Sequence, residues 1–282
     1  MKYMLKNFGI NNNYNNQPTF SSWDRVVKKA DNSSLKNKSY RNDTIWFRNG
    51  IPEIVDTLVD LYKDEKHVNT YIFGCSNGSE PTSMYIYMAS KYGMDTVSKF
   101  TPFNAVDIDK TAIKKASSGH MPMEGFEYER ALDYTYGKFY EFFPTAENIV
   151  ANSNFPNLLN KTRTFKDGST EKGICFKLKD EHAKNMKYSL GNILEDCKKI
   201  NPNELSIVSA RNFIPYLNNE TITELFSNLD KQMKKGSTLI LGDYDFCPRD
   251  REEYFTDFLN ETLREHHFKR VDDDSGYVYI KQ

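Results

Sequence analysis

Two glycines, with an acidic residue two positions after the second, mark the stretch of this sequence most suggestive of a binding site. Gly74 and Gly78 lie in FGCSNGSEPTS (73–83), between an apolar run typical of a strand and a run typical of a helix. Glycine permits positive φ angles and a close approach of the backbone to a ligand. The G-x-x-x-G spacing matches neither the G-x-G-x-x-G dinucleotide fingerprint nor a lysine-containing P-loop. A phosphate cradle is therefore disfavoured, and on spacing alone a structural turn is the better interpretation.

Asp107 shifts the balance towards a bound nucleoside. It falls at the end of the next apolar run, FNAVDID (103–109). In an open α/β sheet, ligands bind beyond the carboxyl ends of the strands, where an acidic side chain can accept hydrogen bonds from both ribose hydroxyls. Glu80 can similarly receive an amino group. Each acid alone is explained by helix capping, but together they favour a positively charged nucleoside without phosphates, for which S-adenosylmethionine is the obvious candidate.

Predicted strands alternate with predicted helices along most of the chain. The strands are expected at 69–74, 103–109, 187–192, 205–210, 237–242 and 277–282. The helices are expected after Pro52, at 80–91, at 110–118, at 219–236 with an asparagine cap and Gly236 as its stop, and at 251–266. This alternation predicts an α/β fold built from right-handed βαβ units with a mostly parallel sheet.

Two segments do not follow this alternation of strands and helices. Residues 1–41 are asparagine-rich and basic, and fit a poorly ordered extension and a docking arm for an acidic partner equally well. Residues 121–187 form an insertion in the predicted domain of residues 42–282, with a β-hairpin expected around Asp167 and Gly168. Insertions of this length are usually functional or flexible.

The bulk composition indicates a soluble cytoplasmic protein. The net charge of −1 points to neither nucleic acid nor a membrane surface, and no apolar segment approaches the length of a membrane span. The four cysteines lie far apart in the sequence and form no C-x-x-C motif, so reduced, buried thiols are expected. His266 and His267 are interpreted as structural, no metal site is expected, and the oligomeric state is left open.

Five stretches, in order, resemble the chemotaxis receptor glutamate methyltransferases of the CheR type. They are NDTIWFR (42–48), GCSNGSEPTS (74–83), VDIDKTAIKKASSG (106–119), FKLKDEHAKNMKYSLGNIL (176–194) and VSARNFIPYLNNET (208–221). The resemblance covers residues 42–282. It implies a Rossmann-like class I methyltransferase sheet with an antiparallel last strand, helices on both faces and an inserted β-hairpin.

The resemblance also implies a cofactor shell for S-adenosylmethionine, with S-adenosylhomocysteine as product. The cofactor-binding residues would be Asn42, Thr44, Arg48, Gly74, Glu80, Asp107, Asn192, Ile193, Arg211 and Asn212. Arg48 would hold the methionine carboxylate, Glu80 the amino group and Asp107 the ribose. Tyr216 would lie near the transferred methyl, which makes Arg48 and Tyr216 the candidate catalytic residues. On this interpretation the glycines of the opening stretch admit an adenosyl group.

The implied activity is the formation of γ-glutamyl methyl esters on an acidic protein such as a chemoreceptor helix. Ser79, Asn77 and Pro215 depart from the family pattern, and the family's helical N-terminal domain has only the basic arm in its place. Two alternatives stay open: a methyltransferase of the same fold that acts on another protein or a small molecule, and a non-catalytic S-adenosylmethionine-binding module. A dinucleotide oxidoreductase is disfavoured because its glycine fingerprint is missing.

Overall fold

The computed structural model describes residues 45–123, 125–143, 162–164, 170–172, 174–246, 254–272 and 277–282. The predicted arm of residues 1–41 and the predicted ligands Asn42 and Thr44 lie outside these ranges. None of the helices in the described ranges is long and apolar enough to cross a membrane.

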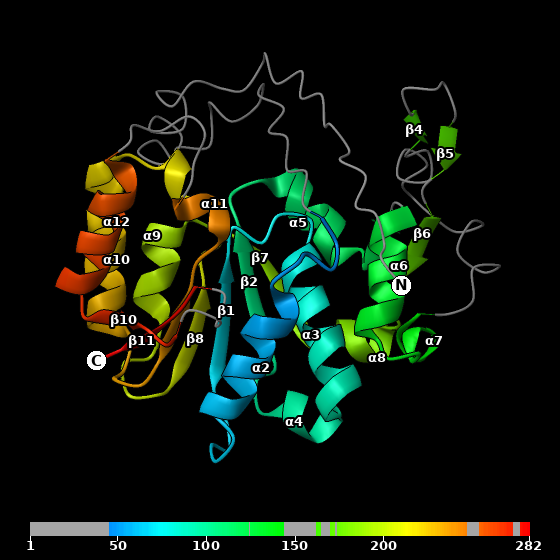
Figure 1. The fold of residues 1–282 in the computed structure, drawn as a ribbon, viewed down its shortest axis with the longest axis horizontal. Helices are drawn as coiled ribbons and strands as arrows, with labels where there is room; N and C mark the ends of the chain where they lie inside the picture. The colour runs from blue at the N-terminus through cyan, green and yellow to red at the C-terminus, as the bar shows by residue number, and fades with distance from the viewer. Residues whose placement is uncertain are drawn as a thin grey trace, which may run out of the picture.

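A seven-stranded sheet in the order β10-β11-β9-β8-β1-β2-β7 forms the centre of the molecule (Figure 1). The strands are β1 (Asn69–Phe73), β2 (Phe103–Asp107), β7 (Met186–Leu190), β8 (Ser206–Ser209), β9 (Thr238–Ile240), β10 (Phe268–Arg270) and β11 (Val278–Lys281). β1, β2, β7, β8 and β9 pair in parallel, whereas β11 runs antiparallel to both β9 and β10. The predicted α/β alternation and antiparallel last strand are confirmed, and the short β10 is an addition to the prediction.

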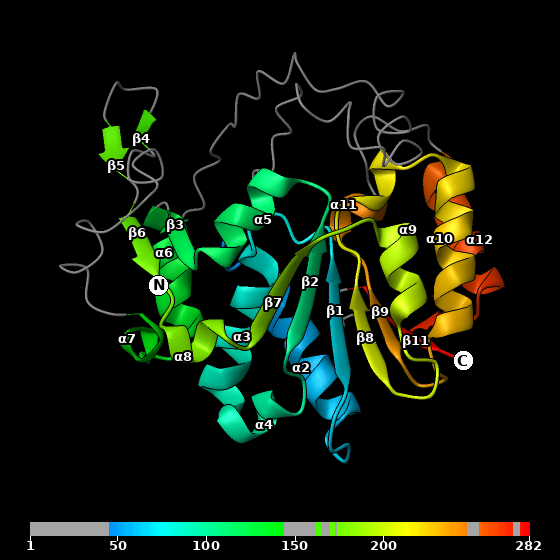
Figure 2. The same cartoon turned by 180° about the vertical axis from the view of Figure 1, so that it is seen from behind.

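Helices cover both faces of the sheet (Figures 1 and 2). One side carries α2 (Ile51–Leu61), α3 (Ser79–Tyr92), α4 (Met94–Ser98) and α5 (Lys110–Ser117), and the other carries α9 (Ile193–Asp196), α10 (Asn219–Gln232) and α12 (Phe255–Glu265). Because side chains alternate along a strand, Ile72 joins the hydrophobic cluster under α2 and α3, and Phe73 joins the one under α10 and α12. The sheet is therefore buried on both sides, as a parallel sheet requires.

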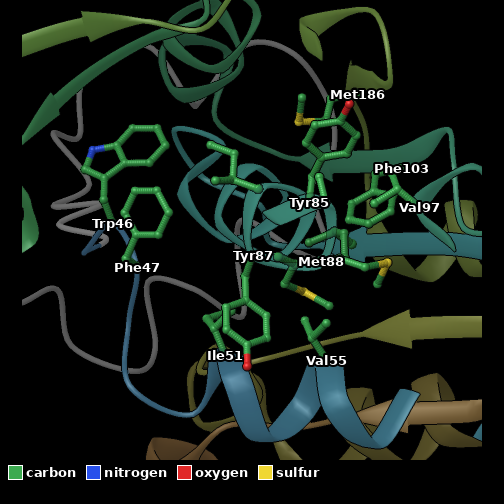
Figure 3. Close-up of a cluster of buried hydrophobic side chains, with 14 of the residues drawn as sticks. Trp46, Phe47, Ile51, Val55, Tyr85, Tyr87, Met88, Val97, Phe103 and Met186 are labelled. Atoms are coloured by element: carbon green, nitrogen blue, oxygen red, sulfur yellow. The ribbon is translucent and has the colours of Figure 1, made fainter. Parts of the chain in front are cut away.

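The cluster under α2 and α3 is rich in aromatic side chains (Figure 3). It brings together Ile51 and Val55 of α2, Tyr85, Tyr87 and Met88 of α3, Phe103 of β2, and Trp46 and Phe47 from the segment before α2. Trp46 and Phe47 are 2% and 0% exposed. The segment that precedes Arg48 is thus anchored in the core.

The chain between α5 and β7 builds a small additional layer. β3 (His120–Met123) pairs antiparallel with β6 (Ile174–Lys177), next to α6 (Gly125–Tyr134), α7 (Phe139–Phe142) and α8 (Asp180–Ala183). β4 (Thr162–Thr164) and β5 (Thr170–Lys172) form the predicted hairpin, whose turn at Asp167 and Gly168 lies outside the described residues. The ring of Phe139 packs against Phe143 and Phe176 with centroids 4.5 and 4.9 Å away, which gives this layer its own aromatic core.

Two smaller predictions are also tested by the fold. Cys75, Cys175 and Cys197 are buried free thiols, as expected, while Cys247 lies outside the described residues. His267 follows α12, and its Nδ1 lies 3.2 Å from Asp230 of α10, in agreement with a structural role.

Helix α10 begins with the predicted asparagine cap but ends earlier than expected. The Asn218 side chain accepts a hydrogen bond from the Thr221 N–H at 2.8 Å. The helix stops at Gln232, and Met233 has extended φ and ψ angles. Gly236, the predicted stop, instead adopts a φ of 89° in the turn that leads to β9.

Replacing the cap tests how much of the stability of α10 is local. We expect Asn218→Ala to lower the free energy of unfolding by about 1 kcal/mol, because the Thr221 N–H loses its side-chain acceptor. Urea unfolding followed by circular dichroism measures this change. Glu224→Ala, at an exposed position of the same helix, is the control and should change stability by less than about 0.5 kcal/mol. Equal effects of the two substitutions would contradict the capping role.

Candidate functional site at the carboxyl edge of the sheet

Asp107 ends β2 and joins the glycine turn to the neighbouring strand. Its Oδ2 accepts the Ser76 N–H at 2.7 Å, and its Oδ1 accepts the Asp109 N–H at 2.8 Å. Burial raises the pKa of this carboxyl, although the backbone N–H groups act in the opposite direction. Each carboxylate oxygen has a second lone pair. Asp107 can therefore still accept hydrogen bonds from hydroxyl groups of a ligand.

The glycine turn adopts the expected positive φ angles, 66° at Gly74 and 84° at Gly78. However, a Cβ atom on Gly74 would lie 2.8 Å from the ring of Phe213, and one on Gly78 would lie 2.6 Å from the Tyr188 hydroxyl. The missing side chains thus make room for Phe213 and Tyr188 of the protein itself, and the expectation that the glycines also admit an adenosyl group stays a prediction. Gly74 is nevertheless exposed, so its backbone remains available to line a ligand site.

Glu80, in the first turn of α3, is held by Ser209, the last residue of β8, and by Arg211, which follows that strand. Ser209 Oγ donates to its Oε1, and Arg211 Nη1 lies 3.4 Å from its Oε2. The Glu80 side chain is 19% exposed and that of Arg211 only 4%. This interaction connects the carboxyl end of β8 with the start of α3 and leaves a partly accessible carboxylate for an amino group.

Arg48 is half-buried beside these charges but forms no ion pair with a described carboxylate. Burial and the neighbouring Arg211 lower the pKa of its guanidinium, and Glu80, Asp243 and Asp245 oppose that shift. Within the described part of the chain, no carboxylate lies within ion-pair distance of Arg48. Arg211 Nε is also buried without a hydrogen-bond partner there. This pair of arginines offers donors that suit a carboxylate of a ligand.

Asp245, which the sequence analysis missed, fixes the loop that carries Arg211 and Asn212. It is fully buried in α11 (Asp243–Phe246) and accepts the N–H groups of Asn212, Gly242 and Ile214 at 2.8, 2.7 and 3.1 Å. Asn212 has a φ of 61°, and its side chain accepts the Tyr244 N–H at 3.2 Å. A side chain on Gly242 would overlap the Asn212 amide. An acidic residue shortly after a predicted strand was the available signal.

The remaining predicted residues lie on loops at the same edge. The Gly191 N–H donates to the Asp107 carbonyl at 3.0 Å, which places Asn192 and Ile193 next to the end of β2. Asn192 caps α9 by accepting the Leu194 N–H at 3.0 Å. Tyr216 ends the 3-10 helix η5 (Ile214–Tyr216), with its ring centroid 6.0 Å from that of Tyr244. Loops after β1, β2, β7 and β8 thus contribute to one edge, and the ligand contacts of these residues stay predictions.

A cavity of about 150 Å³ lies next to this edge but is not formed by it. It is lined mainly by uncharged side chains, among them Trp46, His120 and Tyr188, and it touches the glycine turn only at Asn77. Arg48, Glu80 and Asp107 do not line it. Burial raises the pKa of the Tyr188 hydroxyl, so this group stays protonated. The cavity and the charged groups are therefore separate features.

Comparisons with solved structures return several methyltransferases, together with a precorrin-8w decarboxylase and the [4+2]-cyclase SpnF. A protein from Methanococcus maripaludis assigned as an S-adenosyl-L-methionine-dependent methyltransferase is 9% identical, with 95% of each chain covered and a TM-score of 0.44. The N-methyltransferase NodS from Bradyrhizobium japonicum WM9, in complex with S-adenosyl-L-homocysteine, is 13% identical over 93% of this chain and 98% of that one, with a TM-score of 0.40. The methyltransferase domain of bacterial CtHen1 is 10% identical over 82% of this chain and 100% of that one, with a TM-score of 0.40.

These likenesses concern the fold alone. Because their TM-scores lie below 0.5, the assignment of a class I methyltransferase-like fold stands on the strand order and on the antiparallel β11 between β9 and β10. No protein-family model and no curated protein matches the sequence. The resemblance to receptor methyltransferases therefore remains a prediction.

The protonation of Asp245 predicts how the stability of the protein depends on pH. Burial raises its pKa from 3.8 to about 7, against the opposing effect of the backbone N–H groups and Arg211. The folded protein then keeps a proton that the unfolded chain loses, so stability decreases as pH rises through this range. We expect the stability of the wild type relative to Asp245→Asn to fall by about 2 kcal/mol between about pH 5 and 7, and to level off above about pH 8.

Urea unfolding of both proteins at each pH measures this difference. All other titratable groups contribute equally to the two proteins, so their effect on stability is removed when one value is subtracted from the other. A difference that stays constant between these pH values would show that Asp245 remains ionised, and would contradict the raised pKa.

Proposed function

We propose that this chain is an S-adenosylmethionine-dependent methyltransferase. The observation that carries the proposal is the half-buried Arg48, which has no carboxylate within ion-pair distance among the described residues and lies beside the Glu80–Arg211 pair. A ligand with both a carboxylate and an amino group complements Arg48 and Glu80 together. Asp107, at the end of the adjacent β2, suits the ribose hydroxyls of the same ligand.

The residues present fit the cofactor in charge and in hydrogen-bonding capacity. Arg48 would bind the carboxylate by a charge-assisted hydrogen bond, Glu80 the ammonium group and Asp107 the ribose, while Asn192 and Ile193 would flank the adenine. When bound, S-adenosylmethionine supplies an electrophilic methyl group attached to a sulfonium. The protein's part is to orient the acceptor in line with that group and to exclude water.

For the acceptor, we propose the side-chain carboxylate of glutamate in an acidic protein such as a chemoreceptor helix. This carboxylate is ionised at neutral pH, so the site needs no strong general base. The proposal is supported by the resemblance of residues 42–282 to receptor methyltransferases. Arg48 and Tyr216 would act by holding the donor and by lining the path of the acceptor.

A broader candidate is methyl transfer to another protein or to a small molecule. It is favoured by Pro215, which departs from the receptor-methyltransferase pattern and lies buried in η5 directly before Tyr216. Because proline restricts the backbone on both sides of itself, this residue influences where the tyrosine lies. A different acceptor would meet a differently placed ring.

Binding of the cofactor is the first test of the proposal. We expect the wild type to bind S-adenosylmethionine and S-adenosylhomocysteine in isothermal titration calorimetry, and Asp107→Asn to bind both at least about tenfold more weakly, since hydrogen bonds to a charged acceptor are lost. Asp257→Asn, at an exposed position of α12, is the matched control and should bind normally. Unchanged affinity in Asp107→Asn would remove Asp107 from the site.

The acceptor is tested by the chemistry of the product. With a radioactive methyl donor and acidic receptor fragments, we expect label that is released as methanol by mild base, because a carboxyl methyl ester is hydrolysed under these conditions. Label that survives base would identify an amine or ether product and would favour the broader candidate. A fragment with glutamine in place of glutamate is the control and should stay unlabelled.

A further inference from the structure

Helix α6 binds the backbone of three consecutive residues, 46–48, which lie more than 80 positions earlier in the chain. The Glu127 carboxylate accepts the Trp46 N–H at 2.9 Å, and Arg130 Nη1 donates to the Phe47 carbonyl at 3.0 Å. The Tyr134 hydroxyl donates a longer hydrogen bond, of 3.5 Å, to the Arg48 carbonyl. One helix of the additional layer thus holds the segment that carries Arg48.

These three side chains come from one face of α6. Glu127, Arg130 and Tyr134 follow the three- and four-residue spacing that aligns side chains along a helix. Ala131 on this face is fully buried, and the ring of Tyr134 meets that of Phe47 edge-on, with centroids 6.1 Å apart. Glu127 is only 2% exposed. The contact is therefore a packed interface and not an incidental surface interaction.

Helix α3 holds the same segment from another side. The Phe47 N–H donates to Ser83 Oγ at 2.9 Å, and that hydroxyl donates to the Ser79 carbonyl. Phe47 has a φ of 50°, an angle that non-glycine residues rarely adopt without support from their surroundings. The backbone before Arg48 is thus fixed on two sides, whereas the Arg48 guanidinium has no ion pair within the described residues to fix it directly.

We propose that α6 is the positioning element for Arg48. By fixing the carbonyl of Phe47, Arg130 sets the direction in which the next side chain leaves the backbone, and so aims the Arg48 guanidinium at the carboxylate of the methionine part of S-adenosylmethionine. This inference rests on the proposed function and gives the layer between α5 and β7 a role in binding the cofactor. Glu127, Arg130 and Tyr134 are positioning residues, since they act through the backbone of residues 46–48.

Two ligands that differ in the amino-acid carboxylate allow the role of α6 to be tested. S-adenosylhomocysteine carries the amino-acid carboxylate, whereas 5′-deoxy-5′-(methylthio)adenosine keeps the adenosine and the thioether but has no carboxylate. If α6 acts through Arg48, weakening the contacts between α6 and residues 46–48 lowers the affinity for S-adenosylhomocysteine only. A general loss of structure would weaken the binding of both.

The experiment measures both affinities by calorimetry for Arg130→Met, which keeps the unbranched stem of the side chain but removes its donors. We expect S-adenosylhomocysteine to bind about tenfold more weakly, as for the loss of one charge-assisted hydrogen bond, and the methylthioadenosine affinity to change by less than about twofold. Arg130→Lys, which restores a charged donor, should recover most of the affinity. Arg264→Met, on α12 with a side chain that is 79% exposed, is the matched control.

A double-substitution cycle completes the test. Once Arg48→Met has removed the guanidinium, adding Arg130→Met should cause no further loss of S-adenosylhomocysteine affinity, because both substitutions act on one contact. Additive losses, equal losses for the two ligands, or no loss in Arg130→Met would each overturn the proposal. If the wild type binds neither ligand, the proposed function itself fails before any variant is made, and the role of α6 falls with it.

Discussion

A backbone N–H group that is withdrawn from water must find an acceptor, and at the carboxyl edge of this sheet two buried carboxyl groups meet that requirement. Asp107 accepts from the turn after β1 and from its own loop, and Asp245 accepts from the loops after β8 and β9. Each carboxyl group therefore connects loops that follow different strands. The loop that carries Arg211, one of the proposed ligand-binding residues, depends on the second of these connections for its position.

The charged side chains at this edge differ in whether a neighbouring group neutralises them. Glu80 is shared between Ser209 and Arg211, whereas Arg48 is half-buried with no ion pair in the described part of the chain. Taking a charge out of water without a partner is costly. Proteins tolerate such costs mainly at functional sites, and a ligand carboxylate would offset this one. Arg48, which has no ion pair among the described residues, is therefore a stronger argument for a ligand at this edge than the glycine turn.

The layer between α5 and β7 is joined to the sheet domain at more than one point. Besides the contacts of α6 with residues 46–48, His182 Nδ1 lies 3.0 Å from the hydroxyl of Tyr85, whose backbone belongs to α3. Phe142 of α7 packs on the same histidine with ring centroids 4.8 Å apart. The helix α3 that presents Glu80 at its first turn is thus also the helix on which this layer rests.

The sequence by itself determined the features that depend on neighbouring residues. Apolar runs and caps located six of the seven strands and helices such as α10, because these signals lie within a few residues of each other. The strand β10 was missed because its sequence, FKR, has one apolar residue followed by two basic ones and so gives no apolar run. Only the tertiary structure decided that Phe213 and Tyr188 fill the space at the two glycines, that Asp245 organises the loop of Arg211, and that α6 holds residues 46–48. These are contacts between residues 31 to 139 positions apart, and such contacts are set by how the layers pack rather than by any local pattern.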